Sequence, residues 1–345
     1  MTQILQEQLG HLVGVREVID ETADAKTIVL EIPHTLREKF SYRPGQFLTV
    51  RIPSDTVGGV GRCYSLASSP DVDDHLCVTV KRTAGGYGSN WLCDNVVAGD
   101  QLRVLAPTGT FTPSDITADL VLFAAGSGIT PVMSILKSAL AQSDSHIALF
   151  YANRDAASVI FDAELRRLAQ QHPDRLAVAY WLEAERGMPD QAGLAGFAGA
   201  FSGRDAFLCG PAPFMDLTRR VLRSVGFDAR DVHAEEFVSL SGDPFVPTVQ
   251  ADSGGAVATA VVRLDGRTHT VNWPTSANLI DVLLAEGIDA PFSCRSGECG
   301  SCTATLAAGL VEMENSDALD PDDVADGYIL ACQARPVSPS VEIEF

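Results

Sequence analysis

The sequence predicts a multidomain protein: an antiparallel β-barrel, then an α/β domain with a parallel sheet, then a small cysteine-rich domain. Three observations predict this order. Residues 10–112 hold short β segments broken by Gly and Pro, residues 113–238 alternate apolar strands with amphipathic helices, and residues 259–345 hold four of the eight cysteines. A chain of 345 residues is long enough for two or three such domains.

The first region reads as six β segments with no long helical pattern between them. Their spacing is typical of an antiparallel barrel. The segments are VGVREVI, TIVLEI, FLTVRI, CYSLAS, LCVTVKR and QLRVLAP.

In the second region, from residue 119, the pattern of the sequence changes from short β segments to apolar strands that alternate with helices. Apolar strands such as LVLFAAG and IALFYANR are each followed by an amphipathic segment, PVMSILKSALAQ and FDAELRRLAQQH. Two further strands, LAVAYWL and DAFLCG, precede a last helix, PFMDLTRRVLRSVG. Strands that alternate with helices predict a parallel sheet with helices on its faces.

Residues 239–258 are rich in Gly, Pro, Ser and Asp and predict a linker. The third region then opens with two strands, TAVVRLDG and RTHTVNWP, which are joined at Asp265-Gly266 and followed by the helix NLIDVLLAEG.

The net charge of −20 argues against nucleic acid and anionic membranes as partners, because both would repel an acidic chain. The uncharged run Leu120–Leu136 is marginal for spanning a bilayer and is interrupted by Gly and Pro. The N-terminus lacks the pattern of a secretory signal, so we expect a cytoplasmic protein.

The third region contains Cys294-x4-Cys299-x2-Cys302, with Cys332 further along. This is the plant-type ferredoxin spacing, in which four thiolates hold a [2Fe-2S] cluster. Gly297 and Gly300 would let the loop curl so that backbone N–H groups face the sulfides. A zinc site with four cysteine ligands is the alternative, although zinc ribbons favour paired Cys-x2-Cys units.

Two strings in the barrel region indicate a flavin site. In GRCYSLASSP, alternation places Arg62 and Tyr64 on one face of a strand and Ser65 on the other. An Arg can bind a phosphate, a Tyr can pack on a flavin, and a Ser can hydrogen-bond the flavin N5. VKRTAGGYGSNWL adds Lys81 and a Gly-rich segment.

Two strings in the α/β region indicate a dinucleotide site. AAGSGITP ends a strand and opens a helix, where Gly126 and Gly128 allow a pyrophosphate to approach the backbone and Thr130 follows them. It departs from G-x-G-x-x-G because Pro131 stands in place of the third Gly. FLCGPAPFM ends a later strand with Cys209, Gly210 and Pro211.

Together these strings resemble the ferredoxin-NADP reductase-like superfamily, and the last region resembles a plant-type ferredoxin with a β-grasp fold. The resemblance implies that Gly88, Ser89 and Asn90 cover the flavin pyrophosphate and that the Cys209–Pro211 turn holds the nicotinamide. It also implies functional roles for Glu235 and Phe237, as the family's terminal Glu and aromatic residue. We expect Cys209 to pack beside the nicotinamide rather than act as a nucleophile.

The whole chain is similar to the reductase components of ring-hydroxylating oxygenases, and more narrowly to those of 3-ketosteroid 9α-hydroxylases. The resemblance implies an enzyme that binds NADH and passes its electrons through FAD and the [2Fe-2S] cluster to a Rieske-type terminal oxygenase. The alternatives are a reductase for a di-iron monooxygenase or another acceptor, and a zinc-stabilised interaction protein with a degenerate nucleotide fold.

The motifs allow more than one flavin and more than one nicotinamide nucleotide. FAD is favoured over FMN because the Gly85–Asn90 segment can cover a pyrophosphate. NADH is favoured by the resemblance, although YANRD offers both Arg154 and Asp155 near a ribose.

From Thr259 to the end the chain has 14 acidic and 4 basic residues, a net charge of −10, which predicts an acidic docking surface for a basic partner. Arg295 reads as an exposed cation of the cysteine loop, with offsetting the cluster charge or meeting a partner carboxylate as the alternative role.

Overall fold

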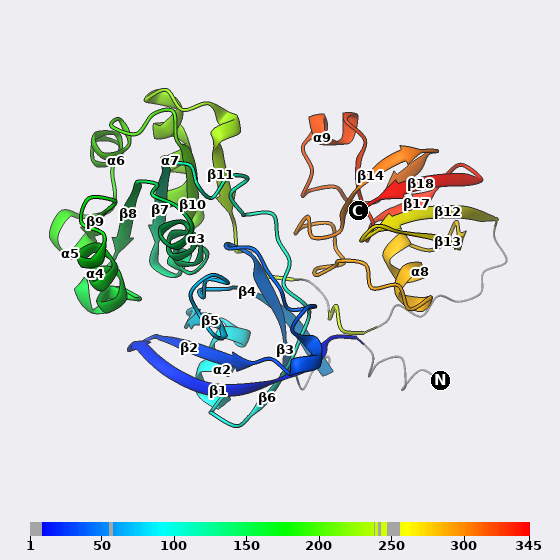
Figure 1. The fold of residues 1–345 in the computed structure, drawn as a ribbon, viewed down its shortest axis with the longest axis horizontal. Coiled ribbons are helices and arrows are strands. Elements are labelled where there is room, and N and C mark those ends of the chain that lie inside the picture. The colour runs from blue at the N-terminus through cyan, green and yellow to red at the C-terminus, as the bar shows by residue number, and fades with distance from the viewer. Residues whose placement is uncertain (1–8, 55–57, 238, 241–242, 247–255) are drawn as a thin grey trace.

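The computed structural model describes residues 9–54, 58–237, 239–240, 243–246 and 256–345. Figure 1 shows three lobes: a barrel (blue to cyan) at the bottom of the view, with an α/β domain (green) above it on the left and a C-terminal domain (yellow to red) above it on the right. This is the architecture that the sequence predicts. No helix in the described ranges is long and apolar enough to cross a membrane.

The barrel is a six-stranded antiparallel sheet in the order β4-β3-β6-β1-β2-β5. A bridge between Leu66 and Val78 brings the two edge strands together and closes the sheet. Inward-facing Val, Ile and Leu side chains fill its centre. The strands are β1 (His11–Thr22), β2 (Ala25–Glu31), β3 (Phe47–Ser54), β4 (Gly58–Ser65), β5 (Leu76–Lys81) and β6 (Gln101–Val104), with a 3-10 turn at His34–Leu36.

The barrel also contains a helix that the sequence analysis did not anticipate, α2 (Tyr87–Asn95). It begins directly after Gly85 and Gly86, in the Gly-rich segment. Glycine is unfavourable within helices. Because glycines lie in and just before this short segment, its sequence does not predict a helix.

The α/β domain is a five-stranded parallel sheet in the order β11-β10-β7-β8-β9. The strand order reverses direction between β7 and β10, and open α/β sheets bind ligands at the carboxyl ends of strands at such a point. The strands are β7 (Leu120–Ala125), β8 (Ile147–Asn153), β9 (Leu176–Leu182), β10 (Asp205–Cys209) and β11 (Val232–Glu235). The helices are α3 (Ile129–Gln142), α4 (Asp162–Gln171), α5 (Glu183–Arg186), α6 (Gln191–Ala198) and α7 (Ala212–Ser224), with 3-10 turns at Gly126–Gly128, Ala156–Ser158 and Ala229–Asp231.

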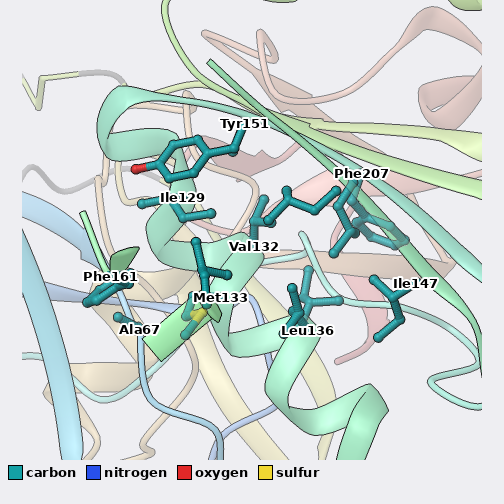
Figure 2. Close-up of a cluster of buried hydrophobic side chains, with 14 of the residues drawn as sticks. Ala67, Ile129, Val132, Met133, Leu136, Ile147, Tyr151, Phe161 and Phe207 are labelled. Atoms are coloured by element: carbon teal, nitrogen blue, oxygen red, sulfur yellow. The ribbon is translucent and has the colours of Figure 1, made fainter. Parts of the chain in front are cut away.

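Helix α3 is buried on nearly every side, because it lies between the parallel sheet and the barrel. Figure 2 shows Ile129, Val132 and Met133 of this helix among side chains of the sheet and Ala67 of the barrel region. Across the same boundary Ser134 donates to the Ser68 carbonyl at 2.6 Å, and the Lys137 ammonium pairs with Asp73 at 2.6 Å. One hydrophobic cluster therefore spans the boundary between the barrel and the α/β domain, in addition to the barrel's own core.

The C-terminal domain is a β-grasp with a core of its own, in which α8 packs on a mixed sheet of order β13-β12-β18-β14-β16. Asp265 and Gly266 both have positive φ, 51° and 72°, as the tight turn between β12 and β13 requires. The strands are β12 (Val257–Leu264), β13 (Arg267–Pro274), β14 (Thr303–Ala308), β15 (Val311–Met313), β16 (Tyr328–Leu330), β17 (Ala334–Pro336) and β18 (Ser340–Glu344). The helices are α8 (Leu279–Ala285) and α9 (Pro321–Ala325).

The division at 112/113 and the linker limits of 239–258 stay predictions. β12 begins at Val257, two residues before the predicted start of the third domain at residue 259. Of the predicted linker, residues 241–242 and 247–255 lie outside the described residues.

Candidate functional site

A cavity of about 490 Å³ opens beside the end of β4, and we call it the β4 cavity. It brings together predicted cofactor residues from both N-terminal domains. β4 and β5 supply Arg62, Tyr64, Ser65 and Lys81, α2 supplies Gly88 and Ser89, α3 supplies Thr130, and Phe237 follows β11. Ser127, Thr79 and Thr83 also line it, and the sequence motifs did not single them out.

Helix α2 starts against β4 because Gly88 has no side chain. A Cβ there would lie 2.8 Å from Arg62 Cγ and 3.4 Å from the Tyr64 hydroxyl. The preceding loop is pinned at Thr83, whose N–H donates to Ser89 Oγ at 3.1 Å and whose carbonyl accepts from Asn90 Nδ2 at 3.2 Å. Asn90 thus holds the loop and does not line the cavity.

The chemistry of the β4 cavity suits a flavin dinucleotide. Arg62 and Lys81 supply positive charge, and the N-terminus of α2 offers free backbone N–H groups, which together favour a pyrophosphate. Burial raises the pKa of the Tyr64 phenol, so the ring stays neutral. The neutral Tyr64 ring can pack on the apolar ring system of a flavin, while Arg62 and Lys81 bind the phosphates of the same flavin dinucleotide.

The two glycine motifs of the α/β domain lie side by side at the carboxyl ends of β7 and β10. A Cβ on Gly128 would stand 2.0 Å from the Cys209 carbonyl oxygen, so only glycine fits there. Gly210 lies close to β7, with Ala125 3.0 Å from its hypothetical Cβ, and Pro211 caps α7. Gly126 has a φ of 54°, and its hypothetical Cβ would be 3.7 Å from Lys81 Nζ.

The Cys209 thiol is buried in the core shared by the barrel and the α/β domain. Burial raises its pKa well above the usual value, with a further contribution from Glu235. A buried, protonated thiol packs as a small apolar group, in line with the expected packing role.

A second cavity, of about 510 Å³, lies where the three domains meet, and we call it the junction cavity. Cys63 and Ser65 of β4 and Phe237 line both cavities, whereas Arg62 and Tyr64 line only the first. This division follows the alternation of side chains along β4, in which Arg62 and Tyr64 lie on one face and Cys63 and Ser65 on the other. The junction cavity is also lined by Phe47, Thr110, Phe111, Arg219, Ala234, Glu235, Glu236, Leu240, Glu298, Cys299, Gly300, Asp317 and Ala318.

Glu235 is the unusual group of the junction cavity. Its Oε2 atom is buried without a hydrogen-bond partner, and burial raises the pKa of the carboxyl to about 8. The neighbouring Glu236 is exposed and is paired with Arg219 at 3.1 Å. Glu235 is therefore the carboxyl that can carry a proton near neutral pH, whereas Glu236 is a surface charge.

The four cysteines Cys294, Cys299, Cys302 and Cys332 come together in the third domain. The Cys294 sulfur lies within hydrogen-bonding reach of Cys299 and Cys332, and Cys332 in turn reaches Cys302. None of these four forms a disulfide, and only Cys299 among them is partly exposed. Gly297 and Gly300 have positive φ values of 82° and 67°, which the curled loop requires.

N–H donors surround these sulfurs. The Ser296 N–H donates to Cys294 Sγ at 3.4 Å, and the Cys332 N–H donates to Cys302 Sγ at 3.4 Å. The side-chain amide of Gln333 donates to Cys332 Sγ at 3.5 Å. Four thiols, three of which accept from N–H groups, form the donor set that an electron-rich cluster needs.

The loop that carries Cys294 docks directly on the barrel. Ser293 Oγ lies 2.7 Å from Thr49 Oγ1 of β3 and 3.6 Å from Cys63 Sγ of β4. Ser293 is fully enclosed in this contact. The cysteine loop therefore packs on β3 and on β4, the strand that also lines the β4 cavity, and no local motif in the sequence reveals this contact.

The expectation that Arg295 is exposed was wrong. Its side chain is 11% exposed, and its guanidinium pairs with Asp281 of α8 and donates to the Val246 carbonyl at 2.8 Å. An Arg at a tight loop can reach back onto a neighbouring helix, and a loop position alone does not predict its exposure.

The two residues after β8 do not distinguish NADH from NADPH as the bound nucleotide. The Asp155 carboxylate caps the following 3-10 turn by accepting from the Ser158 N–H at 2.9 Å. Arg154 pairs with Asp24 of the barrel at 2.9 Å. Both candidate ribose ligands thus already have partners within the protein.

Comparison with known proteins identifies the family. The 3-ketosteroid-9-alpha-monooxygenase ferredoxin reductase component of Rhodococcus rhodochrous is 55% identical over 338 residues, which cover 97% of this chain and 96% of the relative. The chain belongs to this family of reductases. The corresponding component of Mycolicibacterium smegmatis is 53% identical, covering 96% of both chains.

Family models match the three regions in the predicted order. An oxidoreductase FAD-binding domain matches residues 13–112, an oxidoreductase NAD-binding domain matches 122–220, and a 2Fe-2S iron-sulfur cluster binding domain matches 262–337. The fold is that of phthalate dioxygenase reductase, with a TM-score of 0.57, 22% identity and 99% of each chain covered. The match to the iron-sulfur model decides between the cluster and the zinc alternative.

The reductase is therefore an oxidoreductase with domains for FAD, NAD and a 2Fe-2S cluster. The sequence motifs missed Thr49, Ser293 and Gln333. These are polar residues without a motif, and only their burial in the fold marks them out. A buried polar side chain needs a partner, but sequence alone does not say which positions are buried.

Proposed function

We propose that this reductase takes electrons from NADH and delivers them, through FAD and a [2Fe-2S] cluster, to a Rieske-type oxygenase that hydroxylates a 3-ketosteroid. The junction cavity carries the proposal, because Ser65, Glu235 and Cys299 of three different domains line one space. A single cavity shared by the flavin strand, the end of the nucleotide sheet and the cluster loop supports direct transfer between the three sites. The substrate is proposed from the names of the relatives.

The chain's residues would position the reactants. Arg62, Lys81 and the start of α2 would bind the flavin pyrophosphate, with Ser65 donating to the reactive edge of the ring. The Gly126–Gly128 turn would receive the NADH pyrophosphate and the Cys209–Pro211 turn its nicotinamide. The flavin, when bound there, would supply the conversion between the two-electron hydride of NADH and the one-electron cluster. Cys294, Cys299, Cys302 and Cys332 would hold that cluster.

The partner would dock on the acidic third domain. Between Cys302 and Cys332 several carboxylates are exposed to solvent, and opposite charge on the oxygenase would steer the two proteins together. The exposed carboxylates are Glu312, Glu314, Asp317, Asp320, Asp322 and Asp326.

Reconstitution tests this proposal. The purified protein should show overlapping flavin and [2Fe-2S] absorption, and anaerobic NADH should bleach both. Mixed with a Rieske-type ketosteroid oxygenase, it should support NADH-dependent hydroxylation. A protein that reduces cytochrome c but gives no turnover with that oxygenase would contradict the assigned partner, and a colourless folded protein would contradict the cofactor chain.

A further inference from the structure

Part of the predicted linker packs tightly on the barrel. We call Leu240 and Asp243–Val246 the connecting segment. A Cβ on Gly61 of β4 would lie 2.6 Å from Pro244 Cδ, and a Cβ on Gly10 would lie 2.8 Å from the Phe245 ring. Phe245 is only 2% exposed. Glycines far apart in the chain thus leave the space that this segment occupies.

Asp243 anchors the connecting segment to β3. Its Oδ2 accepts from Arg51 Nε at 3.1 Å and from Arg51 Nη2 at 3.0 Å, and its side chain is 10% exposed. Its Oδ1 accepts from the Phe245 N–H at 3.0 Å and so shapes the turn. A Cβ on Gly59 would lie 2.8 Å from Asp243 Oδ2, so β4 makes room for the ion pair as well.

The connecting segment also contacts the cluster loop. The Val246 carbonyl accepts from Arg295 Nη1 at 2.8 Å, and Arg295 directly follows Cys294. Residues two apart on a strand share a face, and on β3 these are Thr49 and Arg51. Thr49 bonds Ser293 of the cluster loop directly, whereas Arg51 reaches the same loop through the connecting segment.

We propose that the connecting segment is a clamp that holds the cluster loop against the flavin strands, with Asp243 as a positioning residue for electron transfer within the protein. This rests on the proposed function. One electron passes from the reduced flavin to the oxidised cluster, and no bond forms or breaks. Because such transfer slows steeply with distance, a loop released from β3 and β4 receives electrons more slowly.

Asp243→Asn tests the clamp. Asn keeps an oxygen for the Phe245 N–H, and so the turn, but it loses the charge that pairs with Arg51. Hydrogen exchange followed by mass spectrometry on the full-length holoprotein should show the amides of Phe245, Val246 and residues 293–296 exchanging about ten-fold faster. In stopped-flow mixing with NADH, cluster reduction should slow by a similar factor of about ten, while flavin reduction keeps its rate.

Asp228→Asn is the matched control. It removes the same charge from an exposed pair with Arg230, and it should change neither measurement. Arg51→Lys is the second variant. It keeps the charge but loses the two-nitrogen contact, so it should give a smaller change in the same direction. It also supplies the comparison if Asp243→Asn does not fold.

Unchanged exchange at residues 293–296 together with an unchanged rate of cluster reduction would overturn the clamp. So would equal effects of Asp243→Asn and Asp228→Asn. Failure of the proposed function looks different, because NADH would then not reduce the flavin or the cluster of the wild-type protein. Hydrogen exchange at residues 293–296 reports whether the cluster loop is docked on the barrel, and it does so whether or not the proposed function is correct.

Discussion

Replacement of Glu235 by Gln should stabilise the protein, and the gain should grow with pH. The Glu235 carboxyl has a pKa of about 8 in the folded protein because it is buried, against 4.5 in the unfolded chain. Between these values the folded state holds a proton that the unfolded state releases. For this raised pKa, the contribution to stability is fully present below pH 4.5 and is lost as pH rises through 8.

The size of the effect follows from the two pKa values. Each pH unit between them removes about 1.4 kcal/mol from the free energy of unfolding. At pH 7 the wild-type protein has lost about 3 kcal/mol relative to pH 4.5, and the full loss is at most about 5 kcal/mol. Glutamine cannot ionise, so the variant escapes this loss and should match the wild type only near pH 5.

Urea unfolding at pH 5, 6, 7 and 8 measures this difference. Trp181 of β9 reports on the α/β domain through its fluorescence. Glu236→Gln is the control, since Glu236 is exposed and paired with Arg219, and its effect should not vary over this range. A stability gain of Glu235→Gln that is the same at every pH, or that shrinks as pH rises, would refute the reasoning.

Three further outcomes are expected. Cys299→Ser should remove the cluster absorption while NADH still reduces the flavin; loss of both would mean that the domains do not work separately. Gly128→Ala places a Cβ 2.0 Å from the Cys209 carbonyl oxygen and should weaken NADH binding about ten-fold or more at unchanged FAD content; titration with an unchanged Kd would contradict this. Transfer to the oxygenase should slow as salt rises from 0.05 to about 0.5 M, because the Debye length falls over this range, and a flat profile would count against docking by charge.

The regular elements could be predicted from sequence because their patterns are local. The apolar runs of β7 and β8, each followed by an amphipathic helix, specify a parallel sheet through neighbouring residues alone. The Asp265-Gly266 turn is predicted in the same way. The cluster cysteines are also local, since three of the four lie within nine residues.

The contacts between domains could not be predicted in this way. The composition of residues 239–258 favours a free linker, yet Asp243 pairs with Arg51 and Phe245 fills a space beside Gly10. These partners are some 190 to 240 residues apart in the chain. A missing Cβ becomes a binding space only when the fold brings another segment to it, and a single sequence does not show where that happens.

The shared core around α3 determines where this enzyme can be recombined. Its apolar side chains contact both Ala67 and Phe111 on the barrel side and Phe207 in the parallel sheet. Exchanging the nucleotide-binding module alone for that of another reductase would therefore leave an ill-matched core on one side of the helix. The described core of the iron-sulfur module draws only on residues from 260 onwards. A chimera joined just before β12 keeps the described hydrophobic clusters intact, but a new iron-sulfur module must still supply partners for the polar contacts at Thr49 and Val246.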